Sequence, residues 1–216
     1  MPERKPPRAI LFDWDNTLVE SWGVIHEAMN LTLAAMGHPH WTREETETRV
    51  RASLRDSFPA MFGGRWRDAE RVFYNSFAAI HLQHLRALPG AGEMLADLAG
   101  QGLYLGVIRN KRGEYLRREG NQLGWAAHIR ALAGAGDAAR DKPAIEHVKL
   151  ALGDLVCGED VWLVGDADID LKCATNAGCT PVLMRPAAPA AGEFPGHEPA
   201  LYFPDCAGLL AYLRQA

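Results

Sequence analysis

The stretch Ile10-Leu11-Phe12-Asp13-Trp14-Asp15-Asn16-Thr17-Leu18 joins a short apolar run to two carboxylates that stand one residue apart. The apolar run predicts a buried strand, and Asp13 and Asp15 come where that strand ends. Carboxylates at the end of a core strand are costly unless a cation or hydrogen bonds compensate them. Two interpretations follow from the stretch alone. Asp13 and Asn16 cap the next element, or the pair belongs to a site that holds a cation.

The composition of the 216 residues is that of an ordinary globular protein. Hydrophobic residues make up 48% and charged residues 23%, proportions that indicate neither disorder nor a membrane protein. The formal charge of −4 is mild, and the chain lacks the basic stripe that is typical of nucleic-acid binders. No apolar run approaches the roughly 20 residues of a spanning helix. We therefore expect neither a nucleic-acid partner nor a membrane partner.

The basic segment 1–8 is followed by an apolar run that is too short for a signal peptide. The four cysteines show no C-x-x-C spacing, and without an export signal they are most simply reduced thiols. We expect a cytoplasmic protein that is a monomer or a homodimer.

Two kinds of pattern divide the chain after a first strand at 9–12. Residues 21–86 carry helical patterns without a strand: a helix at 21–36, a capping box at Thr42 and Glu45, a break at Phe58-Pro59 and Gly63-Gly64, and a helix at 66–86. From residue 88 the patterns alternate, with strands predicted at 103–108, 129–133, 161–164, 181–184 and 201–203, and helices at 92–98, 115–123, 143–152, 168–177 and the C-terminus.

This alternation predicts an α/β fold, a Rossmann-like doubly wound parallel sheet with helices on both faces. The helical block after the first strand is then an insertion. We expect an α/β core of residues 1–19 and 88–216, and an all-α cap of residues 20–87 inserted after the first strand. In an open parallel sheet, ligands bind beyond the carboxyl ends of the strands, so the polar residues at those ends are the candidate site.

Four groups of polar residues lie at such positions, acidic and basic together. The first is the pair Asp13 and Asp15. Because the other groups are expected at the same edge of the sheet, the interpretation that the pair belongs to a cation-binding site is favoured. Asp168, which opens a predicted helix, is expected to cap it. The other three groups are Arg109-Asn110-Lys111, Asp141-Lys142, and Gly165-Asp166 with Asp168 and Asp170.

These residues resemble the motifs of the haloacid dehalogenase-like hydrolases, a superfamily dominated by phosphatases. Residues 13–17 look like its first motif, D-x-D-x-T; Lys142 with Pro143 looks like the third, and Gly165-Asp166 with Asp170 like the fourth. The resemblance runs from about residue 9 to 184, with the spacing of phosphoglycolate-phosphatase-like members, whose helical cap follows the first motif. The second motif departs, because Arg109 stands where the family has Ser or Thr.

The resemblance implies a Mg²⁺-dependent phosphatase that hydrolyses a small phosphorylated metabolite through an aspartyl-phosphate. Asp13 would be the nucleophile and Asp15 the general acid and base, while Lys142 would neutralise the nucleophile and the phosphoryl group. The remaining implied roles are phosphate binding by Arg109, Asn110 and Lys142, and Mg²⁺ binding by Asp13, the backbone carbonyl of Asp15, Asp166 and Asp170, the last as a ligand or an orienting group.

Arg109 leaves two interpretations open. Its guanidinium donates to phosphate oxygens, or it fills the phosphate pocket or pairs with Asp13 or Asp166 and slows turnover. The second leads to an alternative function, a catalytically impaired relative that binds a phosphorylated ligand or a protein partner. A response-regulator-like phospho-acceptor is disfavoured by the helical insertion, and a dehalogenase by the presence of Asp15. The loop 37–41, with its two histidines, either selects substrate, as in the family, or is explained by turn chemistry.

Overall fold

A computed structural model describes residues 6–50 and 53–215 of the chain. Its contacts separate into two compact units: a core unit, Met1–Val19 with Ala87–Ala216, and a helical unit, Glu20–Arg86. Among the described residues, no helix is both long enough and apolar enough to cross a membrane.

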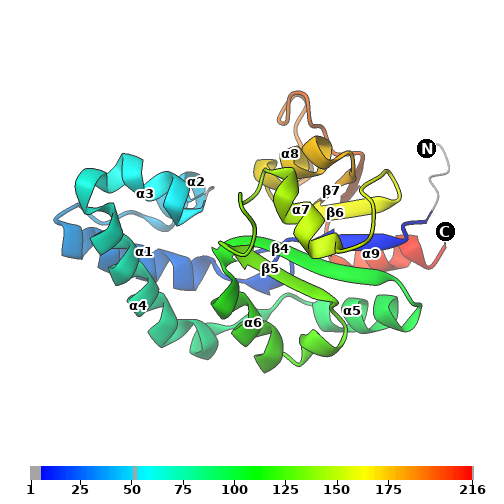
Figure 1. Cartoon of the computed structure of the whole chain (residues 1–216), viewed down its shortest axis with the longest axis horizontal. Coiled ribbons are helices and arrows are strands. Elements are labelled where there is room, and N and C mark those ends of the chain that lie inside the picture. The colour runs from blue at the N-terminus through cyan, green and yellow to red at the C-terminus, as the bar shows by residue number, and fades with distance from the viewer. Residues whose placement is uncertain (1–5, 51–52, 216) are drawn as a thin grey trace. The chain divides into compact units, whose positions relative to one another are not determined.

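The core unit is built on a six-stranded sheet in which neighbouring strands run parallel (Figure 1). The central strand is β1 (Ala9–Phe12). All four of its residues are buried, as a parallel sheet covered on both faces requires. The strand order reverses beside this central strand, which is where open α/β sheets bind ligands. The strands are β1 (Ala9–Phe12), β4 (Tyr104–Arg112), β5 (Ala131–Ala135), β6 (Val161–Gly165), β7 (Thr180–Met184) and β8 (Leu201–Phe203), in the spatial order β5-β4-β1-β6-β7-β8.

Helices cover both faces of this sheet, as Figure 1 shows. On one face, α7 (Ile145–Leu152) and α8 (Asp168–Ala177) contact each other and pack on Leu11, Ile108 and Leu163 of the sheet. The other face carries α5 (Ala91–Gly100), α6 (Gly113–Gln122) and α9 (Cys206–Leu213). The predicted Rossmann-like doubly wound fold is thereby confirmed.

The structure corrects two predictions at the ends of core elements. Strand β4 continues to Arg112 instead of ending at residue 108, with a shift of its register against β5 between Arg109 and Arg112. Helix α8 begins at Asp168, so Asp168 is not its cap. Asp170 supplies the cap contact instead, because its Oδ2 accepts from the backbone N–H of Ala167 at 3.1 Å. Asp168 Oδ1 lies 2.5 Å from Nε2 of His197.

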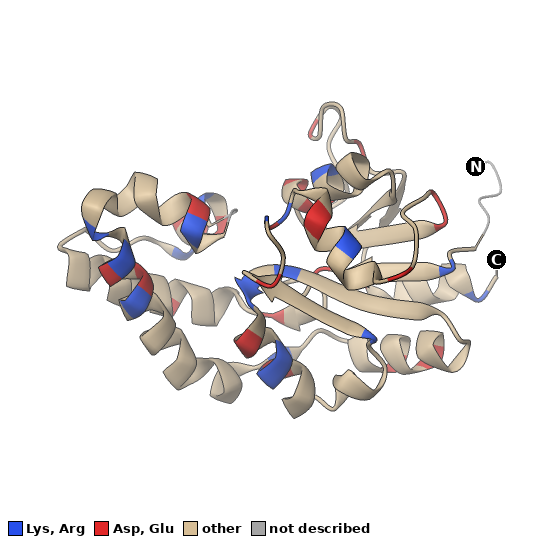
Figure 2. Ribbon diagram, viewed as in Figure 1, with Lys and Arg blue, Asp and Glu red and all other residues tan. Residues whose placement is uncertain are grey.

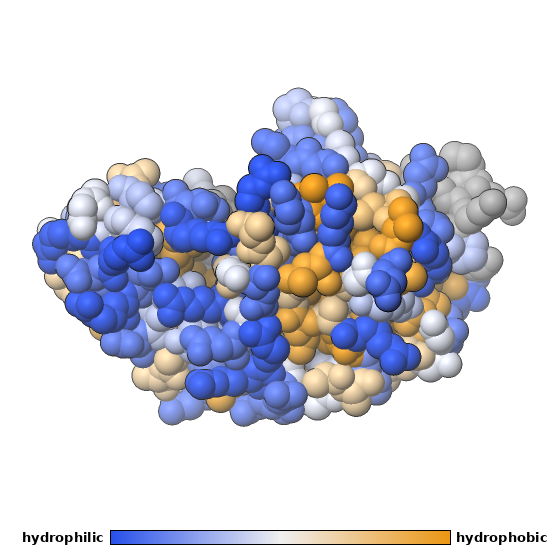
Figure 3. All heavy atoms as spheres, in the orientation of Figure 1, coloured by the Kyte–Doolittle hydropathy of each residue, from blue (hydrophilic) through white to orange (hydrophobic). Residues whose placement is uncertain are grey.

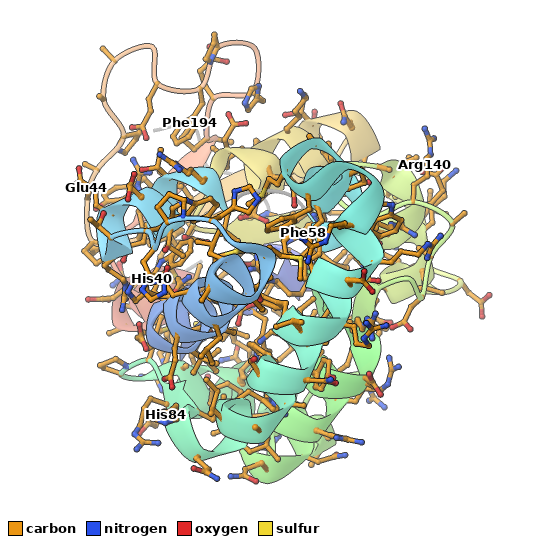
Figure 4. The ribbon with its side chains drawn as sticks, turned by 90° about the vertical axis from the view of Figure 1, so that its left-hand side faces the viewer. His40, Glu44, Phe58, His84, Arg140 and Phe194 are labelled. Carbon is orange, nitrogen blue, oxygen red and sulfur yellow. The ribbon has the colours of Figure 1, made fainter. Side chains whose placement is uncertain are left out.

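The helical unit contains α1 (Trp22–Met36), α2 (Arg43–Arg49), α3 (Leu54–Phe62), a short 3₁₀ turn (Gly63–Arg65) and α4 (Trp66–His84). The capping box at the start of α2 is confirmed. The predicted break at Phe58-Pro59 is wrong, because α3 runs through Pro59 and ends at Gly63. Phe58 and Phe62 are both buried, with ring centroids 4.9 Å apart, and this packing outweighs the cost of roughly 3 kcal/mol for an interior proline. Figure 4 shows Phe58 among the helices of the unit.

The surface of the helical unit is mostly hydrophilic on the face seen in Figure 3, as expected for amphipathic helices that bury their apolar sides against one another. The loop 37–41 is held from within this unit by Asn30. Its amide donates to the Trp41 carbonyl at 3.0 Å and its oxygen accepts from the Trp41 N–H at 2.8 Å. Local bonding therefore accounts for the loop, and its role in substrate selection stays a prediction.

The chain passes between the two units through two short strands that pair with each other, β2 (Val19–Glu20) and β3 (Arg86–Ala87). The sequence pattern predicts no strand here. Two residues are too few to produce a periodic pattern, so the pairing is visible only once the fold brings the two ends of the insertion together.

Candidate active site

The turn that follows β1 is compact and holds two carboxylates at the carboxyl end of the sheet. The N–H of Asp13 donates to the Val164 carbonyl at 2.8 Å, and the N–H groups of Leu18 and Val19 donate back to the Trp14 carbonyl. The Asp13 and Asp15 side chains are 0% and 1% exposed. Buried carboxylates so close together need compensating cations, and the neighbouring strand ends supply them.

Lys142 is the first of these cations. Its Nζ donates to Asp13 Oδ1 at 2.5 Å and to Asp170 Oδ1 at 2.7 Å. Burial opposes its charge, but the attraction of Asp13 and Asp170 outweighs burial and raises the pKa of Lys142. Asn110 fixes the Lys142 backbone, donating to its carbonyl and accepting from its N–H, both at 3.0 Å. The Asn110 side chain is thus engaged with Lys142, and its expected phosphate contact stays a prediction.

Asp13, Asp166 and Asp170 form a cluster in which each offers one oxygen within 4.8 Å of the others. Burial and the negative charges of Asp170 and Asp13 raise the pKa of Asp166 to about 7. Hard carboxylate oxygens gathered in this way, with more negative charge than the adjacent lysine offsets, suit Mg²⁺. The donor set therefore fits the divalent cation that the sequence analysis expects. The Asp15 carboxylate lies outside this cluster, and for this residue the expectation concerns its backbone carbonyl.

Arg109 bridges the two carboxylates of the β1 turn. Its Nε donates to Asp15 Oδ2 at 2.6 Å, and its Nη1 lies 3.4 Å from Asp13 Oδ2. Burial disfavours the charge, but Asp13 and Asp15, with smaller contributions from two further carboxylates, raise the pKa of Arg109. The guanidinium therefore stays charged beside the nucleophile expected from the sequence. The pairing with Asp13, one of the arrangements left open above, is present.

Lys111, two residues further along β4, binds the other oxygen of Asp15. Its Nζ donates to Asp15 Oδ1 at 2.7 Å and to Glu119 Oε2 and Oε1 at 2.8 and 3.1 Å. Trp14, which lies between Asp13 and Asp15 in the sequence, donates from its indole Nε1 to Glu119 Oε2 at 2.7 Å. This hydrogen bond links the turn after β1 to helix α6. Burial is outweighed by Asp15 and Glu119, which raise the pKa of Lys111. Figure 2 shows the basic residues at the end of β4 in blue.

Gly165, at the end of β6, leaves the space that Asp170 occupies. A Cβ atom at position 165 would lie 2.3 Å from Asp170 Cγ, closer than real carbon atoms approach. The glycine of the G-D-x-x-x-D pattern thus has a steric reason. It lets the first turn of α8 fold back over the end of β6, so that Asp170 reaches Lys142.

The structure brings together all seven residues that the sequence analysis singles out: Asp13, Asp15, Arg109, Asn110, Lys142, Asp166 and Asp170. It adds three that the sequence analysis misses, Trp14, Lys111 and Glu119. A signal exists for Glu119, because it lies four residues after the buried Tyr115 on the apolar side of α6, an unusual place for a charge. Lys111 stands in a quoted motif without an assigned role.

Comparison with known proteins shows which family the sequence matches. The sequence model of the haloacid dehalogenase-like hydrolases matches residues 10–184. The phosphoglycolate phosphatase of Rhodospirillum rubrum is 30% identical over 191 residues, covering 82% of this chain and 79% of that protein. The N-acetylmuramic acid 6-phosphate phosphatase of Pseudomonas aeruginosa is 28% identical over 187 residues, covering 82% and 81%. The crystal structure of a predicted phosphatase from Clostridium acetobutylicum superposes with a TM-score of 0.83 at 16% identity, covering 98% of this chain and 100% of that one, a likeness of fold.

Proposed function

The chain belongs to the haloacid dehalogenase-like hydrolases, and from this premise we propose that it is a Mg²⁺-dependent phosphatase that hydrolyses a small phosphorylated metabolite. The observation that carries the proposal is the position of Asp13. Its carboxylate is buried between Lys142 and Arg109, and it also belongs to the cluster of three aspartates. The phosphatase names of the similar proteins support the same reaction class.

In the proposed reaction Asp13 attacks the phosphorus atom of the ester. A bond forms between an Asp13 carboxylate oxygen and phosphorus as the bond from phosphorus to the ester oxygen breaks. Asp15 gives a proton to the departing alkoxide, which leaves as an alcohol. Asp15 then accepts a proton from the water that attacks the phosphorus of the aspartyl-phosphate. The bond between phosphorus and the Asp13 oxygen breaks, inorganic phosphate leaves, and the Asp13 carboxylate is restored.

Three basic or amide side chains support these steps. Lys142 stabilises the attacking carboxylate and the charge on the transferring group, since its ammonium already lies 2.5 Å from Asp13. Asn110 holds the Lys142 backbone in place for this task. Arg109 turns from the two aspartates to the phosphate oxygens when substrate binds, offering fork-shaped donors where the resemblance to the family implies a hydroxyl.

The carboxylates of Asp13, Asp166 and Asp170, with the backbone carbonyl of Asp15, would hold Mg²⁺. When bound, the ion neutralises charge between the carboxylates and the phosphate and acts as a Lewis acid toward phosphoryl oxygen. The helical unit, residues 20–87 of the sequence prediction, would serve as the cap that selects the substrate.

We also propose that the enzyme works in the cytoplasm. This proposal is supported by the four cysteines, Cys157, Cys173, Cys179 and Cys206, which are all free thiols. Free thiols are the usual state of cysteines in a reducing compartment.

The proposal is tested by measuring phosphate release from a panel of small phosphate esters with and without Mg²⁺. We expect hydrolysis that requires Mg²⁺, and a loss of at least about 10³-fold in Asp13→Asn, because the amide cannot act as the nucleophile. Hydrolysis that survives in Asp13→Asn would contradict the proposal.

The contact between Arg109 and Asp13 favours a second candidate, a catalytically impaired relative that binds a phosphorylated ligand or a protein partner. Under this candidate, the guanidinium neutralises the nucleophile permanently. A wild-type protein that binds phosphate esters but releases no phosphate would support it, and measurable Mg²⁺-dependent hydrolysis would exclude it.

A further inference from the structure

The Asp15 carboxylate is held at both oxygens by two different cations. Lys111 Nζ lies 2.7 Å from Oδ1, and Arg109 Nε lies 2.6 Å from Oδ2. Since Arg109 also reaches Asp13, Oδ2 is the oxygen on the side of the proposed nucleophile. Oδ1 faces the interior of the core unit, toward α6.

The two cations are anchored in different ways. Arg109 hydrogen-bonds to Asp13 and Asp15 alone among the described residues, and its side chain is 19% exposed. Lys111 is 7% exposed and has a carboxylate partner of its own in Glu119, which is 1% exposed and also accepts from the Trp14 indole. A bound phosphate can therefore draw Arg109 away from Asp15, while the anchored ammonium of Lys111 stays in place.

A buried ion pair of this kind needs a reason beyond stability. Burying the charges of Lys111 and Glu119 carries a desolvation cost, and apolar residues of similar volume are often no less stabilising. Helix α6 already buries Tyr115 and Leu116, and it packs on β4 and β5. The feature that apolar residues could not supply is a fixed donor to Asp15.

We propose that Glu119 is a positioning residue, which acts through Lys111 to hold Oδ1 of Asp15 and so aims Oδ2 at the leaving oxygen of the ester. The inference rests on the proposed function, since it assigns the orientation of the group that protonates the alkoxide. Trp14 completes the arrangement by donating to Glu119 Oε2, the carboxylate oxygen that lies nearer to Lys111.

Glutamine at position 119 would break this hold with little change in volume. The Glu119 carboxylate accepts from Trp14 and from Lys111, and both of its oxygens lie within 3.1 Å of the Lys111 ammonium. A glutamine amide has only one acceptor oxygen, and its NH₂ group would face a donor. Lys111 therefore shifts, and Asp15 Oδ1 loses its fixed partner.

The experiment compares wild type and Glu119→Gln on two substrates with Mg²⁺: an alkyl phosphate, whose leaving alkoxide needs a proton, and p-nitrophenyl phosphate, whose leaving phenolate does not. For the alkyl ester, we expect kcat to fall about 100-fold in Glu119→Gln, with KM little changed. For p-nitrophenyl phosphate, we expect the rate at which the ester phosphorylates the enzyme, measured in a pre-steady-state burst, to be retained. Glu114→Gln is the matched control, the same change on the exposed side of the same helix, and should behave as wild type.

Equal losses in the rate at which the two esters phosphorylate the enzyme, or no loss with either ester, would overturn the inference. If Glu119→Gln does not fold, the double variant Lys111→Met with Glu119→Gln replaces it, because it leaves no unpaired buried charge. The double variant must show the same selective loss on the alkyl ester. A wild-type protein that hydrolyses neither ester refutes the proposed function itself, whereas an active wild type with an unaffected Glu119→Gln refutes only the role of Glu119.

Discussion

Arg109 stands where the resemblance to the family predicts Ser or Thr, and the structure shows which groups it contacts. The guanidinium contacts Asp13 and Asp15, so it lies where, in our proposal, a phosphate group approaches Asp13. In our proposal it exchanges these carboxylates for phosphate oxygens when the substrate binds.

Arg109→Ser should therefore lower kcat/KM for a small phosphate ester by about 10- to 100-fold, mainly through KM, because charged hydrogen bonds to the phosphate are lost. Steady-state kinetics with Mg²⁺ measure this. Arg109→Lys is the matched control, and it should recover only part of the loss, since an ammonium lacks the guanidinium fork. A serine variant faster than wild type would mean that Arg109 obstructs the site, as the impaired-relative alternative holds.

Gly165 is a second residue with a definite task. Gly165→Ala should destabilise the fold by about 1–3 kcal/mol and raise the Mg²⁺ concentration needed for activity, because the added Cβ would displace Asp170. Chemical denaturation and a Mg²⁺ titration of the rate measure the two effects. Gly100→Ala, at the end of α5 with nothing within 4 Å, is the control and should be neutral or slightly stabilising. Equal stabilities of the two variants would refute the steric argument.

Single residues were predictable from sequence only where strand ends expose them. Asp13 and Asp166 stand directly at such ends, and Lys142 lies in the loop that follows β5, so their convergence follows from the topology of a parallel sheet. Glu119 could not be assigned in that way. It lies in mid-helix, and its partner Lys111 becomes visible only when β4 and α6 pack together.

At the scale of elements, helix α7 carries a buried histidine that ties stability to pH. Burial and the positive charge of Lys142 lower the pKa of His147 below its ordinary 6.5, and its Nε2 lies 3.1 Å from the Ala133 carbonyl. The unfolded chain therefore takes up this proton at a higher pH than the folded one. The contribution to stability is complete above the unfolded pKa and is lost as the pH falls below it.

We expect His147 by itself to lower the free energy of unfolding as the pH decreases below about 6.5, by up to about 1.4 kcal/mol per pH unit, against the opposite contribution of Asp166, whose folded pKa is raised. In His147→Gln, which keeps a donor for the Ala133 carbonyl, the slope should be smaller by that amount. Denaturant unfolding at a series of pH values measures both slopes. Identical slopes would show that His147 titrates alike in the folded and unfolded states.

Most elements were predictable because their periodic patterns are long, and the errors lie where a tertiary contact overrides a local rule. Helix α3 continues through Pro59 because Phe58 and Phe62 bury together. Strand β4 extends past residue 108 because its polar end pairs with β5 across a shifted register. Close approach also matters there, since a Cβ at Gly134 would lie 2.4 Å from the Gly113 backbone. None of these contacts is written in a local pattern.

At the scale of the whole molecule, the charged side chains of the candidate site carry more negative than positive charge. Four carboxylates, Asp13, Asp15, Asp166 and Asp170, face two cations, Arg109 and Lys142, while Lys111 and Glu119 offset each other. With all of these groups ionised, the formal charge is −2, which one divalent cation would neutralise. Binding of Mg²⁺ to the folded state alone should then stabilise the protein.

We expect Mg²⁺ at about 100 times its Kd to raise the free energy of unfolding by about 2.7 kcal/mol. Thermal or denaturant unfolding with and without Mg²⁺ measures the increment, with Na⁺ at equal ionic strength as the control for screening. In Asp166→Asn the increment should largely vanish, because the cluster loses one of its ligands. An increment that is the same in this variant would place the ion elsewhere.

The most direct test of the central claim, that Asp13 is the nucleophile of a phosphatase, is the mass of the protein quenched in acid during turnover of an aryl phosphate with Mg²⁺. In Asp15→Asn the first step can proceed with a good leaving group, but the attack of water on the intermediate lacks its base. The account predicts that this variant accumulates one phosphoryl group, which peptide mapping assigns to Asp13, and that Asp13→Asn/Asp15→Asn accumulates none. Release of phosphate by the wild type with no phosphoryl group trapped on Asp13, or with the group on another residue, would contradict the account.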